Sequence, residues 1–205
     1  MFFWGYAQAQ FVVNGSARQT DNNCWTLTTE QLNLVGSIWN TRKIDLRESF
    51  DVSIDVFAGC RDATGADGLV FGFQPISTSI GGNAEGLGFD GVSPSIGFEI
   101  DTWQNTRKND PSSDHIAIIK NGNLDHGTSN TLAGPYSLPN IEDCRFHDMQ
   151  VNWNAPQKKL EVYWDCKLIL THEIDLVNEI FRGDPFVFGV SQLLRAVRST
   201  INGFA

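Results

Sequence analysis

The sequence lacks the features that define several common classes of protein. Its formal net charge is −9, with no basic patch, and nucleic-acid binding needs clustered lysine and arginine. No apolar run approaches the roughly 20 residues that span a membrane. Its glycines follow no phosphate-loop pattern. These absences argue against nucleic-acid binding, membrane insertion and nucleotide chemistry.

Cysteine is scarce, with four residues and no C-x-x-C spacing, so a zinc site built on thiols is not expected. Their even number suits two disulfides in an exported protein. If "NWNAPQKKLEVYW" forms a hairpin, Cys144 and Cys166 fall roughly opposite each other beyond its strands and are expected to pair. Cys24 and Cys60 then pair by elimination. Four buried thiols are the alternative.

The composition is that of a folded domain. The chain has 205 residues, of which 41% are hydrophobic, and it contains 14 Phe and 6 Trp. This length suits one domain with a substantial core, expected over residues 11–205. The first ten residues, "MFFWGYAQAQ", are either the remnant of a signal peptide with an Ala-x-Ala cleavage pattern or an ordinary first strand. Export would place the protein outside the cell or on its surface.

Hydrophobicity repeats mainly every second residue. In "SFDVSIDVFAG" the apolar residues alternate with Asp and Ser, a pattern typical of a half-buried antiparallel strand. Similar runs recur along the chain, separated by turn signals such as "DATGADG" and "KNDPSSD". Only "DLVNEIFRG" predicts a helix, with Asp175 as N-cap and Gly183 as its stop. The pattern predicts an all-β, antiparallel two-sheet sandwich.

A dense group of acids lies in the segment "FEIDTWQNTRKNDPSSDHIAI", residues 98–118. Alternate residues of a strand share a face, so Glu99 and Asp101 are expected to project side by side. Two carboxylates that close repel each other unless a cation or a shared proton neutralises them. The pair therefore suggests either a metal site or catalytic carboxylates.

The loop that follows can supply further metal ligands. Asn105, Asp110 and backbone carbonyls offer the oxygen atoms that calcium prefers. His115 suits a transition metal better, because imidazole is a nitrogen ligand. The set predicts two adjacent ions that share carboxylates. A surface turn with solvated acids is the alternative.

The spacing in this segment resembles a known metal loop. Its pattern is E-x-D-x-(aromatic)-x-N, then D-P, with His five residues after that Asp. It is similar to the metal loop of the legume lectins and their bacterial L-type relatives, which implies a concanavalin-like jelly roll. The resemblance implies a manganese or other transition-metal site formed by Glu99, Asp101, Asp110 and His115. It also implies a calcium site formed by Asp101, the Trp103 carbonyl, Asn105 and Asp110.

The same resemblance implies a carbohydrate site and makes glycans or glycoconjugates the expected partners. "GADGLVFGFQP" resembles the family's first sugar loop, in which Asp67 would accept hydrogen bonds and the Ala66–Asp67 peptide bond would be cis. The Asn105 amide would donate to a sugar hydroxyl, and the Trp103 ring would stack on the sugar. In the glycine-rich "GGNAEGLGFDG", the backbone N–H of Gly82 is the expected contact.

The resemblance covers residues 11–191 and fails after them. The chain reads "SQLLRAVRSTINGFA" where the family has a small-residue Thr-Gly turn, so the sugar preference is left open. A homodimer through a sheet edge and a monomer both fit the sequence.

Two other functions are considered. The laminarinase-like glucanases share this architecture and carry E-(apolar)-D-x-x-E, but Gln104 or Asn105 stands where their second glutamate would be. An amide cannot protonate a leaving group, so the chain is not expected to be an enzyme. A structural or adhesive sandwich is the other alternative. Among the other histidines, His126 is expected to face solvent, and His147 and His172 to be structural.

Overall fold

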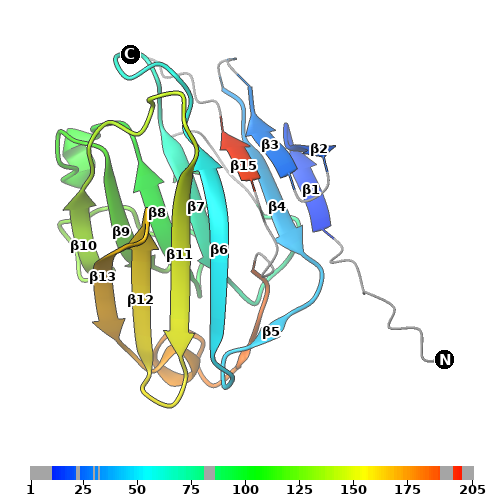
Figure 1. The fold of residues 1–205 in the computed structure, drawn as a ribbon. Coiled ribbons are helices and arrows are strands. Elements are labelled where there is room, and N and C mark those ends of the chain that lie inside the picture. The colour runs from blue at the N-terminus through cyan, green and yellow to red at the C-terminus, as the bar shows by residue number, and fades with distance from the viewer. Residues whose placement is uncertain are drawn as a thin grey trace.

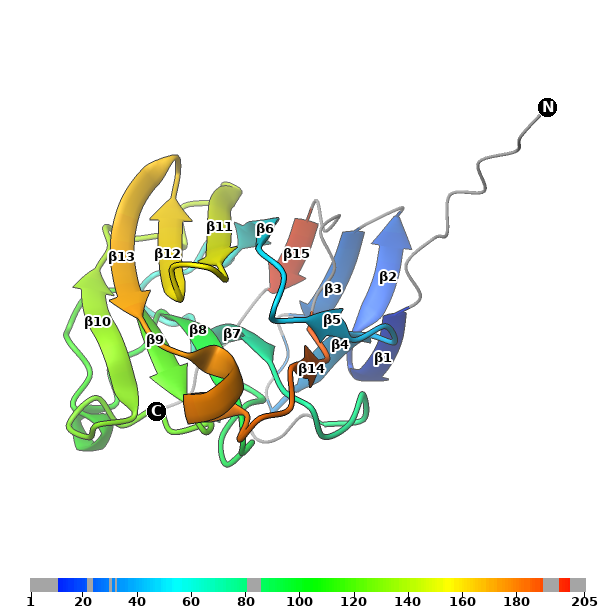
Figure 2. The ribbon, with the colours of Figure 1, turned by 90° about the horizontal axis from the view of Figure 1, so that it is seen from below.

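The computed structural model describes residues 11–21, 24–29, 31, 33–80 and 86–189, and the backbone of residues 196–199. Strands dominate these residues, and two sheets lie face to face (Figures 1 and 2). The prediction of an all-β sandwich is confirmed. No helix among the described residues is long and apolar enough to cross a membrane. The first ten residues and Gly82 lie outside the described ranges.

The larger sheet has seven strands. In spatial order they are β13 (Lys167–Glu173), β12 (Lys159–Trp164), β11 (His147–Asn154), β6 (Phe50–Phe57), β15 (Ala196–Ser199), β3 (Cys24–Thr28) and β2 (Arg18–Asp21). The predicted hairpin is present, since β11 pairs antiparallel with β12 and Asn154 lies opposite Lys159. Strand β15 departs from the antiparallel pattern, because it pairs parallel with both β3 and β6.

The smaller sheet has four antiparallel strands, and two short pairs of strands complete the fold. In spatial order the four are β10 (Thr131–Ser137), β9 (His115–Lys120), β8 (Ile96–Asp101) and β7 (Gly68–Phe73). The short pairs are β1 (Phe11–Gly15) with β4 (Gly36–Asn40), and β5 (Ile44–Asp45) with β14 (Phe186–Val187).

The core between the sheets follows from the period of two. In β6, Val52, Ile54 and Val56 are buried while the intervening residues are half-buried or exposed. Strand β8 is different, because all six of its residues are buried. Its residues 96, 98 and 100 join the main core, and its other face carries Glu99 and Asp101. The acids of β8 are therefore covered rather than solvated.

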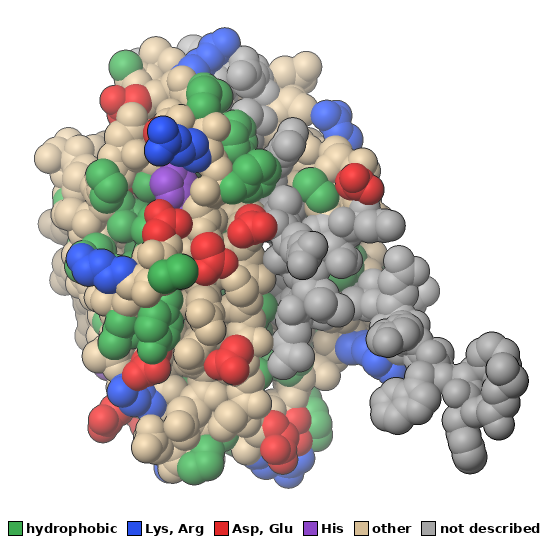
Figure 3. Space-filling view, in the orientation of Figure 1, with side chains coloured by type: hydrophobic (Ala, Val, Ile, Leu, Met, Phe, Trp, Pro, Cys, Tyr) green, Lys and Arg blue, Asp and Glu red, His purple; other side chains and the backbone are tan. Residues whose placement is uncertain are grey.

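The outer face of the larger sheet carries many acidic side chains among hydrophobic ones (Figure 3). Asp51 and Ser53 of β6 are exposed there, and Asp55 is half-buried. Figure 3 shows acidic side chains spread over the face formed by β6, β11 and β12, with only a few basic ones among them. This face accounts for part of the net negative charge of −9.

The one predicted helix is present as a single short turn. The π-helix η3 (Leu176–Ile180) begins after Asp175, whose side chain accepts a hydrogen bond from the backbone N–H of Asn178. Gly183 follows with φ +94°, a conformation that glycine adopts without strain. The predicted N-cap is confirmed, but the helix ends earlier than predicted, at Ile180 with Phe181 as its C-cap.

The predicted disulfide pairing is wrong. The structure joins Cys60 to Cys144, with Cα atoms 4.5 Å apart, and leaves Cys24 and Cys166 as free thiols. The cause is that β11 pairs with β6 as well as with β12. Before β11 the chain follows the β6 side, where the N–H of Cys144 donates to the Gly59 carbonyl at 3.0 Å. Only one of the two expected bridges therefore forms, with different partners.

Candidate functional site

The register between β8 and β9 brings the first functional side chains together. Asp101 lies directly opposite His115, and Glu99 lies opposite Ala117. Residues 99 and 101 share one face of β8 with residues 115 and 117 of β9, away from the main core. A carboxylate pair and an imidazole are thus placed side by side on one face.

The loop after β8 is held by the same carboxylates. The backbone N–H of Trp103 donates to Asp101 Oδ1 at 2.7 Å, and that of Asn105 donates to Asp110 Oδ2 at 2.7 Å. The 3-10 turn η2 (Thr106–Lys108) then carries the chain round to Asp110. Each carboxylate thus uses one oxygen to fix the loop, and the other oxygen of Asp110, Oδ1, has no hydrogen bond among the described residues.

Several oxygen atoms of this cluster are buried without hydrogen bonds. Glu99 is 1% exposed and Asp110 is 7% exposed. Neither oxygen of Glu99 nor Oδ1 of Asp110 has a hydrogen-bond partner among the described residues. Burial raises the pKa of Glu99 well above its usual value, and neighbouring Asp101 and Asp110 raise it further. Buried carboxylates in this state need a cation or a proton.

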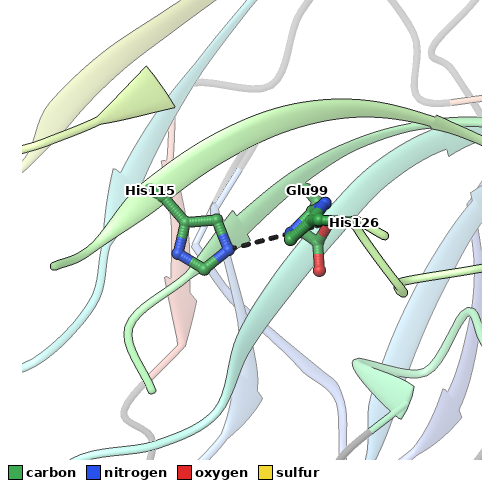
Figure 4. Close-up of side chains that lie close together, drawn as sticks. All are labelled: Glu99, His115 and His126. Atoms are coloured by element: carbon green, nitrogen blue, oxygen red, sulfur yellow. Dashed lines mark hydrogen bonds and ion pairs between the residues drawn. The ribbon is translucent and has the colours of Figure 1, made fainter. Parts of the chain in front are cut away.

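His126 belongs to this cluster, so its expected exposure to solvent is wrong. Its Nε2 lies 3.1 Å from His115 Nε2, 3.5 Å from Glu99 Oε2 and 3.8 Å from Asp110 Oδ1. The His126 side chain is only 2% exposed. Figure 4 shows the two imidazoles meeting beside Glu99. One ligand atom from each of Glu99, His115 and His126 lies within 4.8 Å of the other two.

Contacts between two loops place His126. Its backbone N–H donates to the Lys108 carbonyl at 2.9 Å, and Asn109 Nδ2 donates to Asp125 Oδ1 at 2.7 Å. Burial lowers the pKa of both imidazoles, that of His126 to about 4. Both rings are therefore neutral at pH 7, the form in which histidine ligates metals.

Three of the residues expected to contact sugar, Asp67, Trp103 and Asn105, lie beside this cluster. The Ala66–Asp67 peptide bond is cis, as the resemblance implies. The Asp67 carbonyl accepts from the N–H of Thr102 at 2.9 Å, which ties this loop to the end of β8. Asp67, Trp103 and Asn105 are all half-buried. Burial raises the pKa of Asp67.

The donor set fits metal ions of two kinds. Carboxylate oxygens from Asp101 and Asp110, with carbonyl and amide oxygens of the loop, are calcium ligands by type. Imidazole nitrogen beside a carboxylate suits a transition metal.

Among the other predicted histidines, His147 is structural as expected: its Nδ1 pairs with Asp165 at 2.8 Å and its ring stacks on Trp164.

Comparison with known sequences gives a family and partial relatives. The family model described as the legume lectin beta-barrel domain matches residues 6–192. The pesticidal crystal protein Cry22Aa of Bacillus thuringiensis is 36% identical over 97 residues, which are 46% of this chain and 13% of that protein. The serine-rich adhesin for platelets of Staphylococcus aureus is 28% identical over 159 residues, 67% of this chain and 7% of the adhesin. The chain thus spans a small part of these relatives.

Solved structures of lectins share the fold. The lectin from Bauhinia forficata in complex with GalNAc superimposes with a TM-score of 0.70 and 19% identity, covering 94% of this chain and 89% of that one. At this identity the likeness establishes the fold alone. The matched family model, which extends over most of the chain, establishes more: this protein belongs to the legume lectin (L-type lectin) domain family.

Proposed function

We propose that the chain is a lectin that binds glycans without transforming them, at a surface formed by Asp67, Trp103 and Asn105. Sugars present hydroxyls that donate and accept, and an apolar C–H face. A carboxylate, an amide and an indole ring supply that mixture. Family membership supports this reading, as does the position of these residues on loops joined by the Thr102–Asp67 hydrogen bond. Gly82, outside the described residues, remains the expected backbone contact.

We expect bound metal ions to fix the loop that carries Trp103 and Asn105. The observation that carries the proposal is the dual use of Asp101 and Asp110, each of which holds a loop N–H with one oxygen. Calcium would be held by Asp101, Trp103, Asn105 and Asp110, and a transition metal such as manganese by Glu99, Asp101, Asp110 and His115. When bound, the ions would neutralise the buried carboxylates, and the loop geometry would then be fixed.

Other parts of the proposal concern the chain as a whole. We propose one lectin domain over residues 11–205, secreted or displayed at the cell surface; the partial match to a bacterial adhesin supports this location. Hydrolysis is not proposed, because Gln104 is an amide whose Nε2 donates to the Asp110 carbonyl at 3.4 Å. A homodimer through a sheet edge remains an untested prediction.

A glycan array with and without a chelator tests the proposal. Ions present at about 1,000 times their dissociation constant stabilise a fold by about 4 kcal/mol. Chelation should therefore abolish glycan binding and lower the melting temperature by roughly 10 °C, since about 1 kcal/mol shifts a chain of this size by 2–4 °C. Asp67→Ala should abolish binding while the metal content and melting temperature stay unchanged. Glycan binding that persists in excess chelator would contradict the proposal.

A further inference from the structure

His126 departs from the ligand set that the family resemblance supplies, which contains one imidazole. Its Nε2 and that of His115 approach to 3.1 Å with the rings nearly perpendicular, at 77°. Two nitrogens bound to one ion at about 2.1 Å and at right angles are about 3.0 Å apart. The observed separation is therefore that of adjacent ligands on a common ion.

The outer contacts of both rings leave the facing nitrogens available. His115 Nδ1 lies 3.2 Å from the Ser113 carbonyl, which can only accept, so the proton of the neutral ring is on Nδ1. Its Nε2 then carries a lone pair. His126 Nδ1 lies 3.0 Å from the Thr131 hydroxyl, which can accept in the same way. Contacts of this kind orient metal-ligating histidines in proteins.

A hydrogen bond between the two rings is the competing explanation. It would need the His126 proton on Nε2, and it would satisfy the imidazoles alone. The buried oxygens of Glu99 and Oδ1 of Asp110 would still lack partners among the described residues. An ion at the centre accounts for the nitrogens and the oxygens together.

We propose that His126 is a direct ligand of the transition metal, which adds a second imidazole to the set formed by Glu99, Asp101, Asp110 and His115. The inference rests on the metal cluster of the proposed function. A second nitrogen shifts preference from manganese, which suits carboxylates, toward cobalt, nickel, copper or zinc. Because His126 lies on the loop bonded to Lys108 and Asn109, binding would also join residues 121–131 to the loop that carries Asn105.

Metal titrations of the full chain, saturated with calcium, test this assignment. Cobalt binding is followed by its visible absorption and manganese binding by electron paramagnetic resonance. The expected result is cobalt affinity at least about tenfold above that for manganese. His126→Ala should weaken cobalt binding about 10- to 100-fold and manganese binding less than about threefold, with calcium unaffected. The matched control His172→Ala removes a histidine of β13 outside the cluster and should change neither.

A second measurement needs no variant. Pulsed electron paramagnetic resonance of the copper-loaded wild type should detect the remote nitrogens of two equatorial imidazoles. One imidazole, or equal cobalt affinity in His126→Ala and His172→Ala, would overturn the inference. A wild type that binds neither cobalt nor copper would overturn it together with the metal part of the proposed function. Two imidazoles on a protein that binds no glycan would support the inference and contradict only the carbohydrate proposal.

Discussion

Two buried glutamates, Glu99 and Glu142, are alike in burial and hydrogen bonding but differ in their neighbours. Glu99 is 1% exposed and Glu142 is 3% exposed. Neither carboxylate has a hydrogen bond to any described residue. Burial is the main cause that raises the pKa of each. By burial and missing hydrogen bonds alone, both would be candidates for a metal site.

Their neighbours distinguish them. Glu99 faces two imidazole nitrogens and the carboxylates of Asp101 and Asp110. The charged neighbours that act on Glu142 are acids: burial raises its pKa, and Asp114 and Asp62 raise it further, to about 8. Asp114 is itself occupied, since its Oδ2 accepts from the N–H of Ile141 at 2.8 Å. The donors around Glu99 suit ions, whereas those around Glu142 suit a single proton.

The backbone beside Glu142 supports this reading. A Cβ on Gly65 would lie 1.7 Å from Glu142 Oε1 and 2.5 Å from the Arg61 carbonyl oxygen, so both oxygens border the space beside Gly65. A proton on Glu142 would reduce the repulsion between its carboxyl group and a carbonyl oxygen on the same side. The comparison shows that the donor types around a buried acid, rather than its burial, indicate whether an ion is expected.

The largest expected effect concerns the disulfide beside Glu142. Cys60 and Cys144 close a loop with a sequence separation of 84. Cross-linking a loop of that length removes unfolded-state entropy worth about 4.5 kcal/mol. The double variant Cys60→Ala/Cys144→Ala should lose about that much in urea unfolding. Cobalt affinity should stay within about threefold, because neither cysteine is a proposed ligand and the ligands, which lie inside the closed loop, are held together by the pairing of β8 with β9.

The other two cysteines provide the control. Cys24→Ala/Cys166→Ala removes two thiols that form no bridge, and it should change stability by less than about 1 kcal/mol. Loss of cobalt binding on breaking the Cys60–Cys144 bridge would show that the two regions are not independent.

The next effect is the dependence of stability on pH. The pKa of Glu142 in the fold is about 8, above its unfolded value near 4.5, so the folded state retains a proton that the unfolded chain releases. Stability should therefore fall as pH rises between these values, by at most about 1.4 kcal/mol per pH unit. Glu142→Gln, which keeps the shape and cannot ionise, should remove the contribution of Glu142 and so reduce the slope between pH 6 and 8.

Unfolding is measured with the metals saturating, so that the Glu99 cluster stays ionised throughout. Asp114, whose pKa is also raised by burial, is unchanged in the variant, and any slope that it contributes remains. An unaltered slope in Glu142→Gln would contradict the assignment of the proton. Calcium that stabilises the wild type but not Glu142→Gln would contradict the distinction between the two glutamates, because Glu142 would then hold an ion.

Local patterns in the sequence predicted most of the metal face. Glu99 and Asp101 alternate within one strand, and His115 begins the next strand, so the antiparallel register of β8 and β9 brings them together. The loop between these strands, marked by the Asp-Pro pair, brings Asp110 back to the same cluster. The positions of these four residues depend on strand alternation and on one loop. Both features can be recognised within residues 98–118 of the sequence.

The position of His126 and the disulfide pairing depend on tertiary contacts that local sequence patterns do not indicate. His126 turns inward because residues 121–131 pack against η2 through the Lys108 carbonyl, a tertiary contact between two loops. A second histidine eleven residues after His115, in a polar loop close to the acids, was the available signal. The Cys60–Cys144 bridge depends on β11 pairing with β6, whereas the sequence showed only its hairpin partner β12.

The smallest expected effect concerns the loop that carries His126. Asp125 accepts hydrogen bonds from Asn109 Nδ2 at 2.7 Å and from the N–H of Gly127 at 2.9 Å, so it positions His126 from the adjacent residue. Asp125→Ala removes no ligand and no direct partner of a ligand ring. It should weaken cobalt binding only about threefold, the effect of one ordinary hydrogen bond, because the Lys108 contact still holds the loop. The pH slope assigned to Glu142 should not change. A loss as large as that of His126→Ala would mean that Asp125 is itself a ligand, and the donor set around Glu99 would then include its carboxylate.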